Sequence, residues 1–168
     1  RGLGDVYKRQ VQHRAADQPD LLAQLLRRVT SLPVKDLEDA QVAQANTVYV
    51  MPAGGELTVR RGCLHFRAAT QHPRSRCPIN TFLTSLAQDQ GARATGIVLS
   101  GMGSDGMLGL QAIRSRGGMT LVQQPDTAEF SSMPQSAIDA GCVDVQAPAS
   151  ELPGHVLSRL CLLYTSDA

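Results

Sequence analysis

The residues best suited to chemistry lie between positions 94 and 110. An apolar run at 97–99 ends in a glycine-rich turn that holds one carboxylate, Asp105, and helical spacing follows. This order is typical of the strand–turn–helix unit of open α/β sheets, which place their sites outside the carboxyl ends of the strands. The chemistry of the chain therefore depends on whether the turn binds a phosphate or orients a catalytic group.

One hypothesis is a dinucleotide site. Residues 101–106 match the pattern G-x-G-x-x-G, and Asp126 follows at about the ~20-residue distance expected of a ribose-binding acid. The pyrophosphate of such a ligand binds the N–H groups at the start of the helix. Asp105 argues against this hypothesis, because at ~4 Å and an effective dielectric near 20 its carboxylate would repel a phosphate by about 4 kcal/mol.

A second hypothesis makes Asp105 the functional group. A carboxylate at a helix N-terminus is stabilised in its ionised form, and it can accept a hydrogen bond from a histidine, fix its tautomer and stabilise the imidazolium during nucleophilic catalysis. The histidine must lie at the end of a neighbouring strand. His13, at the end of the apolar segment 11–13, fits this better than His65, His72 or His155.

A structural alternative explains the same residues without catalysis. Aspartate is a common N-cap, and a single histidine is most often an ordinary surface or core residue. No G-x-S-x-G nucleophile elbow is present, and neither Ser100 nor Ser104 stands alone on a sharp turn.

The elements that must position these residues alternate between strand and helix patterns. Spacing predicts helices over 20–31, 78–90, 107–116, 133–140 and 149–160, and strands over 34–37, 47–51, 97–99, 119–122 and 143–145. Residues 57–66 read as a hairpin around a turn at 60–63. We predict an α/β fold with a doubly wound, mostly parallel sheet, helices on both faces, and an antiparallel β-hairpin.

Composition narrows the range of functions. The chain has 168 residues, enough for one domain, and a net charge of +1 with scattered basic residues, which argues against nucleic acid as a partner. Because no apolar run approaches ~18 residues and no signal-peptide pattern is present, we expect no direct membrane insertion. Four cysteines without a C-x-x-C pair suggest reduced thiols of a cytoplasmic protein. Cys77 near His72 is weak support for a metal site, so neither metal nor cofactor is expected.

Several segments together resemble the catalytic domain of chemotaxis-type protein-glutamate methylesterases, the CheB family. The resemblance covers 11–160 and is carried in order by residues 11–13, 47–52, 96–106 and 133–138. Residues 85–91 and 140–144 are similar in particular to the methylesterase part of methylesterase–methyltransferase fusions. We therefore expect 11–160 to be a partial methylesterase catalytic domain.

The resemblance implies a serine hydrolase with a Ser–His–Asp triad that hydrolyses γ-glutamyl methyl esters of chemoreceptors and releases methanol, without a cofactor. His13 would be the general base and Asp105 its orienting acid. The expected partner is a methylated chemoreceptor in two-component, phosphorelay signalling, with a receiver domain and a methyltransferase domain as further parts of the parent protein.

The same resemblance implies an oxyanion site and a cleft. The backbone around Met102, flanked by Gly101 and Gly103, would lie beside the oxyanion. The segment with Met133 and Pro134 would pack near the cleft.

The sequence also departs from the family pattern. The family's nucleophilic serine lies in a glycine-rich turn after the first strand, before the histidine, whereas no serine precedes Ser31 in this sequence. We therefore expect the first strand and the nucleophile turn to be missing and the fragment to be inactive. Arg14 follows His13 where an apolar residue is usual, and Asn80 stands where the family often has Asp.

Residues 1–10 and 161–168 bear no family likeness and resemble translated adapter sequence, so we expect both to be non-native ends. The alternative, a strand over 5–11 that completes the sheet, is disfavoured because 5–9 is too polar for a central parallel strand. Two other classes of function stay open: a dinucleotide-binding module, and a non-catalytic regulatory or docking domain of a sensor fusion.

Overall fold

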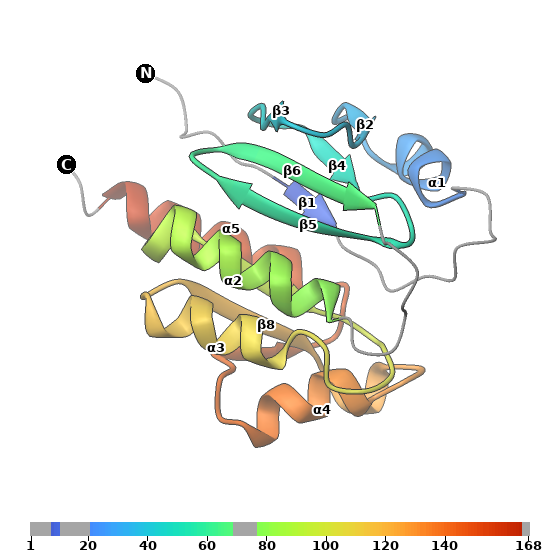
Figure 1. The fold of residues 1–168 in the computed structure, drawn as a ribbon. Coiled ribbons are helices and arrows are strands. Elements are labelled where there is room, and N and C mark those ends of the chain that lie inside the picture. The colour runs from blue at the N-terminus through green and yellow to red at the C-terminus, as the bar shows by residue number, and fades with distance from the viewer. Residues whose placement is uncertain (1–7, 11–20, 69–76, 166–168) are drawn as a thin grey trace.

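The computed structural model describes residues 8–10, 21–68 and 77–165 of the chain, with side chains for 21–68 and 77–161 (Figure 1). In chain order the elements are β1 (Lys8–Gln10), α1 (Leu21–Val29), β2 (Val34–Asp36), β3 (Gln41–Val42), β4 (Val48–Val50), β5 (Gly55–Arg60), β6 (Cys63–Ala68), α2 (Pro78–Gln90), β7 (Thr95–Val98), α3 (Met107–Ser115), β8 (Met119–Gln123), α4 (Ser132–Asp139), β9 (Val145–Ala147) and α5 (Leu152–Thr165). Short 3-10 turns follow α2 at Gly91–Arg93 and β8 at Pro125–Thr127.

The strands of the described residues form three sheets. Two are parallel, with the strand orders β1-β4-β2 and β7-β8-β9, and the third is antiparallel with the order β3-β6-β5. The mixed α/β class, the parallel strands and the antiparallel hairpin were predicted correctly. The parallel strands divide into two sheets where one was expected, because no hydrogen-bonded ladder joins β1 to β7 among the described residues.

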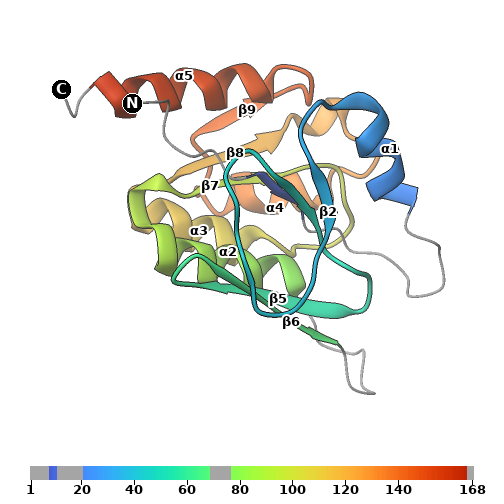
Figure 2. The ribbon, with the colours of Figure 1, turned by 90° about the horizontal axis from the view of Figure 1, so that it is seen from above.

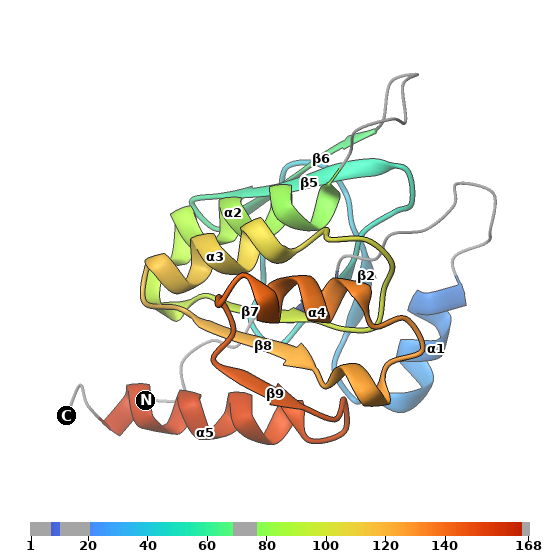
Figure 3. The ribbon, with the colours of Figure 1, turned by 90° about the horizontal axis from the view of Figure 1, so that it is seen from below.

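Helices cover both faces of the β7-β8-β9 sheet, as predicted. Neighbouring residues of a strand point to opposite faces, and on β8 Val122 joins the large core with α2 and α3 while Leu121 packs with Leu152 of α5. Figures 2 and 3 show the sheet between α5 on one side and α3 and α4 on the other.

The predicted hairpin is formed by β5 and β6. Arg61 and Gly62 connect them with φ values of 50° and 73°, the left-handed pair that a two-residue hairpin loop of the right twist requires. Asp89 of α2 accepts hydrogen bonds from both of these N–H groups, which fastens the loop to the helix. The sequence pattern missed β3, which adds to the outer edge of β6.

Helices α2 and α3 lie side by side (Figure 1) and pack closely because α3 carries Gly109. A Cβ atom on Gly109 would lie 2.5 Å from the Leu83 Cβ and 3.3 Å from the Asn80 Cα. Leu83 itself is buried beside Leu110 and Ile113 of α3 in the main core. Glycine at this position therefore sets how near the two helix N-termini can come.

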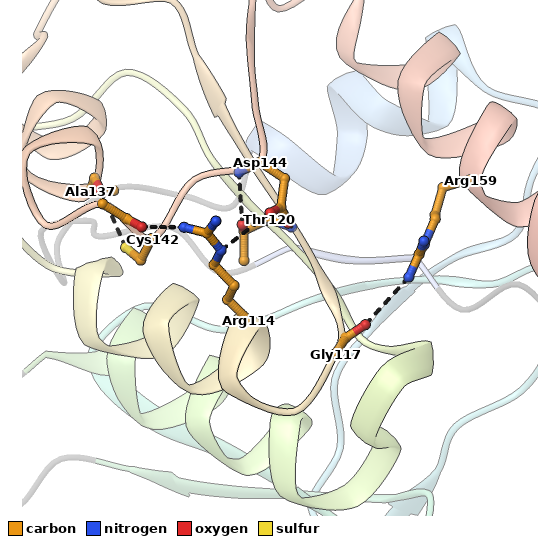
Figure 4. Close-up of polar contacts among 8 residues, drawn as sticks. Arg114, Gly117, Thr120, Ala137, Cys142, Asp144 and Arg159 are labelled. Atoms are coloured by element: carbon orange, nitrogen blue, oxygen red, sulfur yellow. Dashed lines mark hydrogen bonds and ion pairs between the residues drawn. The ribbon is translucent and has the colours of Figure 1, made fainter.

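A polar junction joins α3 to β8 and to the segment before β9 (Figure 4). The Arg114 Nε lies 3.3 Å from an Asp144 carboxylate oxygen, and Arg114 also donates to the Gly141 carbonyl. The other Asp144 oxygen accepts the N–H and the hydroxyl of Thr120, each at 2.9 Å. This pairing satisfies the buried Thr120 hydroxyl.

Cys142 lies in the same junction and is buried. Its thiol donates to the Ala137 carbonyl at 3.2 Å (Figure 4), and desolvation by burial raises the pKa of the thiol. Beyond the end of α3, Arg159 of α5 donates to the Gly117 carbonyl at 3.4 Å (Figure 4).

Parts of both chain ends belong to regular elements. β1 falls within 1–10, and α5 continues past 160 to Thr165. Among the described strands β1 pairs with β4 alone and lies at the edge of its sheet, where a polar strand is tolerated, so the objection to a polar central strand does not apply to it there. That residues 1–10 and 161–168 are non-native ends stays a prediction.

Among the described helices, none has both the length and the apolar character needed to cross a lipid bilayer.

The close approach of α2 and α3 can be tested with two helical glycines. Gly109→Ala should lower the free energy of unfolding by about 1–3 kcal/mol, because the new methyl group overlaps Leu83. In Gly154→Ala of α5, where a Cβ meets nothing within 4 Å, the free energy of unfolding should rise by about 0.5–1 kcal/mol. Urea denaturation of both variants measures this, and equal effects would contradict the packing described.

The raised pKa of Cys142 predicts a pH dependence of stability. Above about pH 8.5 the thiol ionises in the unfolded chain but keeps its proton in the folded one, so the unfolded state binds fewer protons. The free energy of unfolding should therefore fall as the pH rises through this range. Urea titrations at pH 8 and pH 10 should show a smaller fall for Cys142→Ala than for the parent, and an equal fall would contradict the raised pKa of this thiol.

Candidate active site

Asp105 lies in the turn between β7 and α3, at the carboxyl end of the strand, as the sequence predicted. Only 8% of its surface is exposed. Burial of a carboxylate is costly unless its oxygens are hydrogen-bonded, so its partners decide what this residue does.

Both carboxylate oxygens accept backbone N–H groups from the start of α2. Oδ2 accepts the Ile79 N–H at 3.0 Å, and Oδ1 accepts the Asn80 N–H at 2.8 Å. α2 begins at Pro78, and Cys77, its N-cap by position, makes no side-chain capping bond. Asp105 therefore caps a helix 25 residues away in sequence, at the positive end of its dipole.

The structural alternative, in which Asp105 caps the helix that it precedes, is wrong in its helix, because Asp105 caps α2 and not α3. α3 has Gly106 as its N-cap, with φ of 101°, and a Cβ there would lie 2.7 Å from the Val98 Cγ2. A glycine has no side chain to serve as a cap. The missing cap comes from Asn80, whose Oδ1 accepts the Gly106 N–H at 2.9 Å and the Gly109 N–H at 3.0 Å.

We call this arrangement of Asn80, Asp105 and the four N–H groups they accept the crossed cap. α3 takes its N-terminal cap from α2, and α2 takes its cap from the turn that leads into α3. The sequence identified Asp105, whereas Asn80 stood out only as a departure from the family pattern. An Asx residue at the third position of a helix is the only local sign that could have identified it.

The glycine turn is fastened to the segment that leads into α4. The Gly101 N–H donates to the Phe130 carbonyl at 2.9 Å, and the Gly101 carbonyl accepts the Met133 N–H at 3.1 Å. A Cβ on Gly101 would lie 2.5 Å from the Met133 Cε. The structure therefore brings Gly101 and Met133 together, and Pro134 is buried next to them in α4.

Met102 stands apart within this fastened turn. The Gly103 N–H donates to the Ser132 hydroxyl at 3.0 Å, and Gly103 takes φ of 84°. Between the two tied glycines, 74% of Met102 is exposed, and no hydrogen bond of the described residues uses its N–H. The Met102 N–H is thus left open between two glycines whose own N–H groups are hydrogen-bonded.

His13 and His72 lie outside the described residues. His65 lies on β6, opposite Thr58 of the hairpin, and His155 lies on α5, across the sheet from α3. Neither shares a hydrogen bond with Asp105. Among the described residues no group of three or more His, Cys, Asp or Glu side chains is placed to hold a metal ion.

The N-terminus of α3 is poorly suited to a pyrophosphate. Its Gly106 and Gly109 N–H groups, which a phosphate would need, already donate to Asn80. The buried Asp105 carboxylate lies beside them. The geometry therefore argues against a dinucleotide site.

Known proteins resemble the chain over most of its length. The family model described as CheB methylesterase matches residues 9–156. The crystal structure of the Thermotoga maritima CheB methylesterase catalytic domain superposes with a TM-score of 0.82 at 25% identity, covering 92% of this chain and 84% of that one. The chain belongs to the CheB methylesterase family.

Two relatives show how much of a longer protein the chain spans. The protein-glutamate methylesterase/protein-glutamine glutaminase 1 of Carboxydothermus hydrogenoformans is 32% identical over 156 residues, which cover 89% of this chain and 46% of that protein. An uncharacterized 104.1 kDa protein of Rhodobacter capsulatus is 40% identical over 124 residues, covering 73% and 13%. The chain therefore spans less than half the length of these relatives.

The capping role of Asp105 predicts a large effect on stability. Asp105→Ala leaves two N–H groups of α2 without an acceptor and should lower the free energy of unfolding by about 2 kcal/mol or more. Asp126→Ala removes an exposed carboxylate and should change it by less than about 0.5 kcal/mol. Urea denaturation compares the two, and a loss for Asp105→Ala no larger than for Asp126→Ala would contradict the crossed cap.

Proposed function

We propose that this chain is part of a protein-glutamate methylesterase, a serine hydrolase that cleaves glutamyl methyl esters on a chemoreceptor and releases methanol. The observation that carries the proposal is the buried Asp105 carboxylate, held by two N–H groups at the carboxyl end of β7, in a chain of the CheB methylesterase family.

In this proposal Asp105 orients His13. Each carboxylate oxygen uses one acceptor position for a backbone N–H and keeps another. An imidazole N–H can therefore bind without displacing the crossed cap. Fixed in this way, His13 takes the proton of the attacking serine and returns it to the departing methoxide, while Asp105 stabilises the imidazolium.

The Met102 N–H is the proposed oxyanion donor. A donor is most effective when its direction is set before the reaction. The hydrogen bonds of Gly101 and Gly103 to residues 130–132 hold the peptide on either side of Met102. Met133, packed against Gly101, would form part of the cleft wall.

We propose that the nucleophilic serine comes from a further strand of the longer protein, which precedes this chain and pairs with β7. β7 is an edge strand of its sheet among the described residues. Ile97 and Leu99 are 40% and 43% exposed, whereas parallel strands are usually buried on both faces. A strand along this edge would bring a serine to the same carboxyl end as Asp105.

The proposal extends to a second activity, to partners and to location. The relative from Carboxydothermus hydrogenoformans is also named a protein-glutamine glutaminase. The same residues could support this hydrolysis, with ammonia as the leaving group. A receiver domain and a methyltransferase domain are the proposed further parts, and the size of the Rhodobacter capsulatus relative is consistent with a multidomain parent. Four free cysteines are consistent with a cytoplasmic location.

The direct test measures methanol release from a methylated chemoreceptor by the longer protein that includes the preceding segment. Asp105→Asn keeps an acceptor oxygen for α2 but changes the partner of His13, so kcat should fall by roughly 10³–10⁴-fold. The kcat of the His13→Ala variant should fall at least as far, and the Asp126→Asn variant should keep the parent kcat. Folded variants at Asp105 and His13 with unchanged activity would refute the assignment, and an inactive parent would favour a docking domain.

A further inference from the structure

Asn80 occupies an unusual position at the start of α2. Its single Oδ1 atom accepts the N–H of the N-cap residue and the N–H of the third residue of α3, Gly106 and Gly109. In a capping box, two side chains of the same helix serve these two groups. In this fold one amide oxygen from a different helix serves both.

The contacts of Asn80 and Asp105 form a closed loop. The Asn80 N–H donates to the Asp105 carboxylate at 2.8 Å. The peptide N–H that directly follows Asp105, that of Gly106, donates back to the Asn80 side chain at 2.9 Å. Asn80 therefore holds the backbone of Asp105 on one side and its carboxylate on the other.

The residue that follows Asp105 does not fix the backbone at the start of α3. Gly106 has no side chain and takes a left-handed φ of 101°, a conformation that glycine reaches without strain but does not enforce. Asp105 and the start of α3 thus depend on a partner outside their own segment. Within the described part of the chain, the Asn80 Oδ1 supplies the acceptor for both N–H groups.

We propose that Asn80 is a positioning residue for the ester hydrolysis proposed above. It acts through Asp105: by holding the peptide between Asp105 and Gly106, it sets the direction from which the carboxylate meets the histidine. The expected effect of Asn80 on kcat rests on the proposed function. Its expected effect on the hydrogen bonds of Asp105 rests on the crossed cap alone. Because the role needs an acceptor oxygen, aspartate at this position can fill it, whereas an apolar side chain of similar size cannot.

The structural part can be tested on the 168-residue chain by itself. Asn80→Leu should raise the hydrogen-exchange rate of the Ile79 N–H at least tenfold, because a released Asp105 no longer holds its bond to Ile79. Leu83→Ala loosens the same helix pair in the core without touching the crossed cap. Exchange is read under conditions in which both variants are folded. The Ile79 N–H should be protected in Leu83→Ala, and equal protection in Asn80→Leu would overturn the proposal whether or not the chain belongs to an esterase.

The catalytic part is tested in the longer protein that contains the nucleophile. Asn80→Leu should lower kcat by about 10–100-fold with little change in KM, since a small misplacement of a catalytic group has effects of this size. Asn80→Asp should restore most of kcat, and Leu83→Ala should keep it near the parent value. A kcat for Asn80→Leu equal to that of Leu83→Ala, or no recovery in Asn80→Asp, would overturn the positioning role. A parent without activity would instead count against the proposed function, and the exchange result would be unaffected.

Discussion

The N–H groups at the starts of α2 and α3 must find acceptors, and neither helix supplies its own. The N-cap positions are Cys77 for α2 and Gly106 for α3, and neither residue caps its helix through a side chain. Unpaired N–H groups at a buried helix start cost about 1–3 kcal/mol each. Asp105 supplies the acceptors for α2, and Asn80 supplies the acceptor for α3. These hydrogen bonds hold the Asp105 carboxylate in one direction.

The rest of the site follows from keeping the two helix starts close. Gly109 removes the side chain that would separate α3 from Leu83, and Gly106 removes the one that would collide with Val98. The same need for close approach recurs in the turn, where Gly101 packs against Met133. Glycines therefore serve packing in this turn more than phosphate binding, although in sequence they mimic a dinucleotide turn. The carboxylate of Asp105 is the feature of this turn that distinguishes a catalytic turn from a dinucleotide-binding turn.

Local patterns predicted much of this fold, because helix and strand periodicity is a local property. α2 begins and ends at the predicted residues, 78 and 90, and the hairpin at 57–66 was correct. Contacts between residues far apart in the sequence could not be predicted from local patterns. Nothing near Asp105 in sequence indicates that its partners are Ile79 and Asn80, and the two-residue strand β3 is too short to show a period. The edge position of β1 likewise depends on which strands pair, and composition alone does not decide this.

The central claim is that the Asp105 carboxylate accepts both N–H groups at the start of α2. Scalar coupling across hydrogen bonds, measured by NMR on the chain labelled with ¹⁵N and ¹³C, reports such contacts directly. We predict couplings from the amide nitrogens of Ile79 and Asn80 to the Asp105 carboxyl carbon. Spectra in which the backbone couplings within α2 are visible but neither coupling to Asp105 is found would contradict the account.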